Sequence, residues 1–418
     1  MNSVRTVETA RPESGVFRIV VFVVLLASYI VNAMDRQLFP LVAPDVRREY
    51  GFSLAGVGLL STVFTLGMAV AGVPTGFLLQ RLSRKAVLQT GIALFSAGTV
   101  LTVAARGFAD MLIYRTVTGV GEAMQLTVLL AIAANYFAGH RAAAVGAVNF
   151  SFALGAIAGP LLGGALLAAY GQWQVPMLVF GLIGFAAMAL IAVVVHPSST
   201  DGDAVTAVVS DDGAPTTLVN RNTILLTIMS LLGGLVIYGY LGLYPTFLRE
   251  RLGYSPAAAG SVMSLYGLGA LTSIGGGWIG DRGSPRVVLG VTFAAAGVLG
   301  YLLFNGSANF YWQAVLSCAW GVIVSGVVYV NLAGYHVKAV QRQLASRASG
   351  LFVTSLYVSA AFAGYVMGWI ANQASWGHAG ILQISMCSFA ASALALGVRS
   401  HAESGKVEKW RSGKVSEK

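Results

Sequence analysis

Apolar residues run along this chain in long stretches of about 20, separated by short breaks that contain charged residues, glycine, proline or asparagine. A helix of about 20 apolar residues matches the thickness of the hydrocarbon core of a bilayer. The pattern predicts twelve membrane-spanning helices, which begin near residues 17, 53, 86, 110, 142, 175, 223, 255, 287, 311, 348 and 378. We therefore expect an all-α integral membrane protein.

The composition agrees with this expectation. Of the 418 residues, 56% are hydrophobic and only 10% are charged, and the mean hydropathy is +0.74. A soluble core of this size needs more polar surface than the chain offers. The lipid bilayer is thus its expected surroundings.

The formal net charge of +10 could point to a nucleic acid, but the basic residues follow alternate spans. The positive-inside rule explains this spacing better. It predicts that both termini lie in the cytoplasm. We expect a multi-pass protein of the inner (plasma) membrane and no nucleic-acid partner. The first apolar run is longer than the core of a cleavable signal, so the first helix is expected to direct insertion.

One stretch between the sixth and seventh spans is rich in Ser, Thr, Asp and Gly, which is typical of a flexible linker. The predicted division is a cytoplasmic tail (1–16), a six-helix bundle (17–196), a cytoplasmic linker (197–222), a second six-helix bundle (223–399) and a cytoplasmic tail (400–418).

The two halves repeat one another at a shift of about 200 residues, most clearly in the basic turn after the second and eighth spans. The turns contain Gly76, Gln80, Arg81, Arg84 and Lys85 in the first half and Gly277, Asp281, Arg282, Gly283 and Arg286 in the second. Two related bundles that face each other across a central cavity would produce such a repeat.

In these residues the chain resembles the major facilitator superfamily, whose loop motif is Gly-x-x-x-Asp-Arg-x-Gly-x-Arg/Lys. The second half carries the motif intact, whereas the first half has Gln80 at the acidic position and Ser83 at the glycine. In that family the acid helps to hold the cytoplasmic side shut, so the resemblance implies a weaker, neutral latch in the first half.

Two further patterns fit the same resemblance. Arg115, Gly119 and Gly121 match the family's fourth-helix pattern, and Gly155, Gly159 and Pro160 belong to its fifth-helix Gly-x-x-x-Gly-Pro pattern. A proline among glycines favours either a bend that changes between states or close helix packing. Both interpretations stay open.

Four ionisable residues interrupt apolar spans: Asp35 and Arg36 in the first, and Arg115 and Glu122 in the fourth. Each costs about 2.5–3.5 kcal/mol at a bilayer centre, so each must line a wet cavity or pair inside the bundle. Asp35 and Arg36 point about 100° apart on a helix, so separate partners are expected. Asn32 and Gln125 lie on the same two polar stripes, which we expect to meet.

The Asp-Arg pair and the Arg-x-x-x-Gly-x-Gly-Glu face are similar to the anion:cation symporter family. That resemblance implies that Arg36 contacts the substrate carboxylate and that Asp35 and Glu122 carry coupling protons. Arginine suits a carboxylate because its planar fork donates two parallel hydrogen bonds. The alternative is a structural charge network that holds the first bundle together.

The second half offers hydroxyls and amides but little charge, which suits a small carboxylate with an apolar or aromatic body. The candidate binding residues are Arg36, Asn32, Arg115 and Gln125 in the first half and Tyr240, Tyr244, Tyr266, Asn331, Tyr335 and Tyr357 in the second, with Tyr238 and Tyr329 as further candidates.

The sequence thus favours a proton-coupled symporter of a small organic anion, such as a monocarboxylate, that works by alternating access as a monomer. The alternative is a proton-coupled exporter of lipid-like or drug-like compounds, because Spinster-like transporters share the Asp-Arg pair and the Gly-Glu-Ala run at Gly121, Glu122 and Ala123. We expect no enzyme, cofactor or metal site, since no nucleophile–base pair, ligand cluster or phosphate loop is evident. A receptor or scaffold would need a soluble signalling domain or a longer tail.

Overall fold

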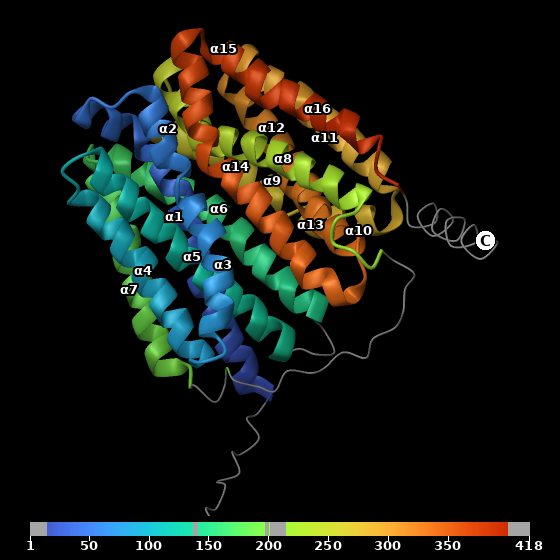
Figure 1. Cartoon of the computed structure of the whole chain (residues 1–418). Helices are drawn as coiled ribbons and strands as arrows, with labels where there is room; N and C mark the ends of the chain where they lie inside the picture. The colour runs from blue at the N-terminus through green and yellow to red at the C-terminus, as the bar shows by residue number, and fades with distance from the viewer. Residues whose placement is uncertain (1–14, 137–140, 197–199, 201–214, 400–418) are drawn as a thin grey trace, which may run out of the picture.

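The computed structural model of the chain describes residues 15–136, 141–196, 200 and 215–399 (Figure 1). Within them, twelve helices are long and apolar enough to cross a membrane, and each starts at most four residues from its predicted position. The described part contains no strand. The predicted C-terminal tail, residues 1–14 of the predicted N-terminal tail and most of the predicted linker lie outside the described residues.

The first half contains six spans, and the second of them is broken at Val63. Its helices are α1 (Gly15–Tyr50), α2 (Leu54–Thr62), α3 (Phe64–Leu78), α4 (Arg84–Val103), α5 (Phe108–Tyr136), α6 (Arg141–Tyr170) and α7 (Gln174–Val194).

The second half repeats this order, and its second span is also broken, between α9 and α10. Three of its other spans contain π-helical segments, which the first half lacks among its described residues. Its elements are α8 (Arg221–Thr246), η2 (Phe247–Arg251), α9 (Pro256–Ala270), α10 (Ser273–Arg282), α11 (Pro285–Asn305), α12 (Phe310–Trp320), η3 (Gly321–Tyr329), α13 (Val330–Lys338), η4 (Arg342–Leu344), α14 (Ala345–Gln373), α15 (Trp376–Ala379), η5 (Gly380–Met386) and α16 (Cys387–Ala395).

The repeat extends to the turn between the first two spans of each half. Gly51 and Gly253 adopt left-handed φ angles of 67° and 72°, a conformation that favours glycine. Two residues later, Ser53 and Ser255 each accept a hydrogen bond from the backbone N–H of the new helix, 3.0 and 3.2 Å away. The same local chemistry therefore starts α2 and α9.

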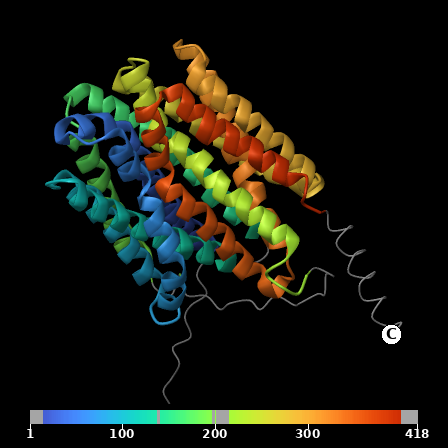
Figure 2. The same ribbon diagram turned by 45° about the horizontal axis from the view of Figure 1, so that its top comes forward.

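The two halves meet through paired glycines. A Cβ atom on Gly58 (α2) would lie 2.1 Å from the carbonyl oxygen of Gly364 (α14), and one on Gly260 (α9) would lie 3.3 Å from the Cα of Gly164 (α6). Figure 2 shows α14 lying along α2 and α3. Because each pair joins a second span to the fifth span of the other half, these are the same contact repeated by the internal symmetry.

Burial differs between the two ends of α1 and α8. Every residue of α1 from 32 to 44, and of α8 from 236 to 246, is buried. Towards the start of these helices, Val23, Ile224 and Ile228 are 55%, 49% and 40% exposed. Both helices are thus enclosed at the end where α1 finishes, which we call the closed end, and partly exposed towards the other end, which we call the linker end.

Candidate substrate and proton site

All four predicted charges lie together inside the first half, midway along α1 and α5. Their side chains are at most 5% exposed. Arg36 Nε lies 3.1 Å from Glu122 Oε2, and Arg115 Nη1 lies 3.9 Å from Asp35 Oδ2. Asp35 and Arg36 therefore have separate partners, as their 100° separation requires, and the two polar stripes do meet.

The two acids have different surroundings. The Thr99 hydroxyl on α4 lies 2.8 and 2.9 Å from the two carboxylate oxygens of Asp35, to which it donates. Neither carboxylate oxygen of Glu122 has a hydrogen-bond partner among the described residues. Hydrogen bonding therefore stabilises the carboxylate of Asp35, whereas Glu122 has the guanidinium of Arg36 as its ion-pair partner. The sequence did not single out Thr99, because a threonine in a membrane helix is too common to give a signal.

Aromatic rings surround both guanidinium groups. Arg115 lies between Phe39 and Phe64, with its Cζ 4.8 and 5.5 Å from the ring centres. Arg36 lies 5.9 Å from the rings of both Tyr29 and Phe152. Such contacts stabilise a buried cation without using its N–H donors. Nη2 of Arg36 accordingly has no hydrogen-bond partner among the described residues and can serve a ligand.

An amide network fixes α1 against α5 next to these charges. The Asn32 side chain donates to Gln125 Oε1 (2.8 Å), and Gln125 Nε2 donates to the Ser28 hydroxyl (3.0 Å). Both amides are fully buried. Two of the predicted binding residues therefore lie one turn from Glu122 and Arg36 and orient the helices that carry them.

The space beside Arg36 is shared by both halves. A cavity of about 10 Å³ there is lined by Arg36, Ser61 and Phe152 from the first half and by Tyr238 from the second, among others. This is room for about one water molecule. The charges thus lie where the two halves meet, at the inner limit of the tightly packed closed end.

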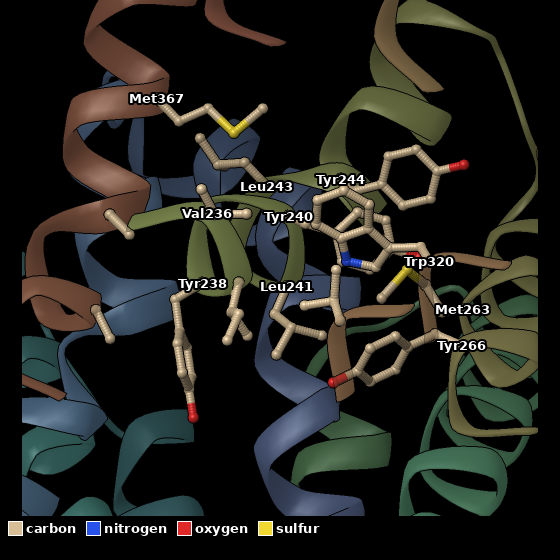
Figure 3. Close-up of a cluster of buried hydrophobic side chains, with 14 of the residues drawn as sticks. Val236, Tyr238, Tyr240, Leu241, Leu243, Tyr244, Met263, Tyr266, Trp320 and Met367 are labelled. Carbon is tan, nitrogen blue, oxygen red and sulfur yellow. The ribbon is translucent and has the colours of Figure 1, made fainter. Parts of the chain in front are cut away.

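Tyr240 and Tyr244 lie elsewhere than predicted. They stack on each other with ring centres 4.5 Å apart, and their hydroxyls bond to Ser317 (2.7 Å) and Gln313 (2.6 Å) on α12. Figure 3 shows Tyr238 leaving α8 on the side opposite to both. Positions two residues apart on a helix point about 200° apart, so Tyr238 faces Arg36 and Tyr240 cannot. Tyr266 bonds to Ser325, also within the second half.

Asn331 and Tyr335 likewise serve the packing of the second half. They donate to the carbonyl oxygens of Gly276 (2.9 Å) and Gly280 (3.0 Å) and so hold α13 against α10. Tyr357 on α14 differs, because its ring lies 6.0 Å from that of Tyr238, which lines the cavity beside Arg36. Of the second-half candidates, we therefore retain Tyr357, with Tyr238 and Tyr329, for the site.

The loop-motif residues lie at the linker end. In the second half, Asp281 pairs with Lys338 at 2.6 Å, Arg282 covers the Trp278 ring, and Arg286 Nε donates to the Val398 carbonyl oxygen. In the first half, Arg84 and Lys85 donate to the carbonyl oxygens of Thr200 and Ala192, while Gln80 and Arg81 are exposed. The intact motif thus carries an ion pair where the first half has an exposed amide.

The fifth-helix glycines pack directly behind the charges. A Cβ on Gly155 would lie 2.5 Å from the Cβ of Ala33, and one on Gly159 would lie 2.8 Å from the Cα of Met34. Helix α6 runs on through Pro160 without a break. These contacts favour the close-packing interpretation over the bend and set the position of Asp35 and Arg36.

A metal site is not supported by the described residues, which contain no group of three His, Cys, Asp or Glu side chains able to hold an ion.

A model of the Major Facilitator Superfamily matches residues 25–364. The chain is 24% identical over 342 residues to the 4-hydroxybenzoate transporter PcaK of Pseudomonas putida, covering 73% of this chain and 76% of that protein. It is 29% identical over 176 residues to protein spinster homolog 1 of Xenopus laevis, covering 41% of this chain and 34% of that protein. The structure of a bacterial homolog to the human lysosomal transporter Spinster, in an inward-facing and occupied conformation, has a TM-score of 0.72 at 17% identity and covers 94% of this chain and 99% of that one.

Proposed function

We propose that this chain, which belongs to the Major Facilitator Superfamily, is a proton-coupled symporter of a small organic monocarboxylate. Membership of the family makes it a transporter and not an enzyme. It works by alternating access as a monomer in the inner membrane, with the linker end in the cytoplasm. The named activity of the 4-hydroxybenzoate transporter supports an aromatic acid among the candidate substrates.

The observation that carries this proposal is the position of Arg36. Its guanidinium is buried at the boundary between the halves, has an unpartnered Nη2 and contacts a single acid, Glu122. A planar, positively charged fork can bind a carboxylate through two parallel hydrogen bonds. Tyr29 and Phe152 supply an apolar surround for the rest of a small substrate.

Charge balance supports coupling to a proton. Asp35, Arg36, Arg115 and Glu122 sum to zero when all are ionised. A monoanion that enters this buried group adds one negative charge, which is costly at low dielectric. A proton on Glu122 restores neutrality and releases Arg36 for the substrate, so the two binding events favour each other.

The charged residues at the two ends support the orientation. The closed end carries both signs: Arg47, Arg48, Arg106, Arg249 and Arg251 beside Asp45, Glu49, Asp110 and Glu250. The linker end is mostly basic and includes Arg81, Arg84, Lys85, Arg221, Arg282, Arg286, Lys338, Arg347 and Arg399 beside Asp281. By the positive-inside rule the linker end faces the cytoplasm.

The second candidate is export of lipid-like compounds. Two observations favour it: the match to spinster homolog 1, and the exposed apolar side chains near the linker end, such as Ile224 and Ile228. Uptake of radiolabelled carboxylates into proteoliposomes under an inward proton gradient separates the two. The symporter requires uptake that Arg36→Ala abolishes. Absence of carboxylate uptake, together with proton release on addition of a lipid substrate, would support the exporter.

A further inference from the structure

We infer that the transported anion carries a hydroxyl group at the end opposite its carboxylate, and that Tyr329 and Tyr357 bind this hydroxyl. The inference rests on the proposed function and narrows its substrate class. We call these two side chains the hydroxyl pair.

The hydroxyl pair comes from two elements of the second half. Tyr329 ends η3 and Tyr357 lies on α14, and their hydroxyl oxygens are 3.3 Å apart. The ring of Tyr357 lies 6.0 Å from that of Tyr238, which lines the same cavity as Arg36 of the first half. A substrate held by its carboxylate at Arg36 can therefore present its far end to the opposite half.

The hydroxyl pair has hydrogen-bonding capacity to spare. Two phenols provide two O–H donors, and their mutual bond uses one of them. At 3.3 Å this bond is also longer than the 2.7–2.8 Å that is usual between hydroxyls. One donor and several lone pairs remain, so the pair can both donate and accept. A ligand hydroxyl has this same double character, whereas a carboxylate only accepts.

The surroundings of the hydroxyl pair are apolar. The ring of Phe352 lies 5.5 Å from that of Tyr329, and the ring of Tyr238 lies 6.0 Å from that of Tyr357. Tyr238 in turn contacts Phe64 of the first half, at 6.1 Å. These rings offer flat apolar surfaces for the body of a substrate. A second charge at its far end would lose its hydration without gaining a counterion.

Two other buried tyrosines of the second half, Tyr240 and Tyr244, lack this spare capacity. Tyr240 bonds to Ser317 and Tyr244 to Gln313, each on the side of α8 away from Arg36. Tyr240→Phe is therefore a matched control. It removes a buried hydroxyl from the same half without touching the proposed site.

The test compares uptake of 4-hydroxybenzoate and benzoate into proteoliposomes by wild type, Tyr329→Phe, Tyr357→Phe and Tyr240→Phe. Loss of one hydrogen bond to a substrate hydroxyl costs about tenfold in affinity. We expect wild type to have a KM for 4-hydroxybenzoate about tenfold below that for benzoate. Tyr357→Phe and Tyr329→Phe should bring the two values together by raising the first, and Tyr240→Phe should leave the ratio unchanged.

Benzoate uptake serves as the internal check on folding, and the wild-type preference can be read without any variant. Equal wild-type KM values, or a full preference in a Tyr329→Phe or Tyr357→Phe variant that still transports benzoate, would overturn hydroxyl recognition and leave the proposed symporter intact. Failure of the wild type to transport either acid would overturn both.

Discussion

Arg249 of η2 bonds to both carboxylate oxygens of Asp45 on α1 and also donates to the Leu41 carbonyl oxygen at 3.1 Å. It thereby crosses from the second half to the first at the closed end. A second ion pair, Arg47 with Glu250 at 2.7 Å, crosses in the opposite direction. These contacts add directional bonds to the glycine pairs that hold this end shut.

The first prediction concerns this gate. Asp45→Asn removes the charge that faces Arg249, whose side chain is only 9% exposed. We expect a cost to the closed state of about 2 kcal/mol, or a roughly thirtyfold shift towards opening. The readout is labelling by a membrane-impermeant maleimide of Ser61→Cys, which lines the cavity beside Arg36, in a Cys318→Ser, Cys387→Ser background.

Arg47→Ala is the control for the gate, because this pair is 34% and 26% exposed and a solvated pair contributes less than about 1 kcal/mol. Faster labelling is expected for Asp45→Asn than for Arg47→Ala. Equal rates in both variants and the parent would show that the glycine contacts alone hold the end shut.

A second prediction tests the two contacts of the Asp35 carboxylate by their effect on stability. Asp35→Asn leaves the fully buried Arg115 without its acid, which should destabilise the fold by about 3–5 kcal/mol. Thr99→Val removes one hydroxyl donor and should cost about 1–3 kcal/mol. Thermal unfolding in detergent gives the order. An Asp35→Asn protein as stable as wild type would contradict the ion pair.

The third prediction tests helix packing. A Cβ on Gly119 would lie 1.7 Å from the Phe64 carbonyl oxygen, so Gly119→Ala must move α5 from α3, at a cost of about 1–3 kcal/mol. Gly146 on α6 has nothing within 4 Å of such a Cβ, so Gly146→Ala should be neutral or slightly stabilising. The melting temperatures of the two variants should differ in this order, and equal losses would contradict the packing described.

The sequence predicts the fold well because membrane spans depend on long apolar runs, which need no knowledge of tertiary contacts. It also predicts that Asp35 and Arg36 have separate partners, since a charge inside an apolar span must find one, but only the structure shows that Arg36 pairs with Glu122 and Asp35 with Arg115. It fails for Tyr240 and Tyr244, because spacing along a helix shows that two side chains share a face but not which face meets the cavity. Thr99 needs the fold, because its partner Asp35 lies 64 residues away in the chain.

The account depends most on the link between the buried acid Glu122 and entry of the anion. We would therefore measure proton uptake into weakly buffered proteoliposomes, by an internal pH dye, on addition of 4-hydroxybenzoate to wild type and Glu122→Gln. Wild type should acidify the lumen as the anion enters, and faster at lower external pH. Glu122→Gln should exchange labelled for unlabelled anion without moving protons. Proton uptake coupled to the anion at an undiminished rate in Glu122→Gln would contradict the role of this carboxylate.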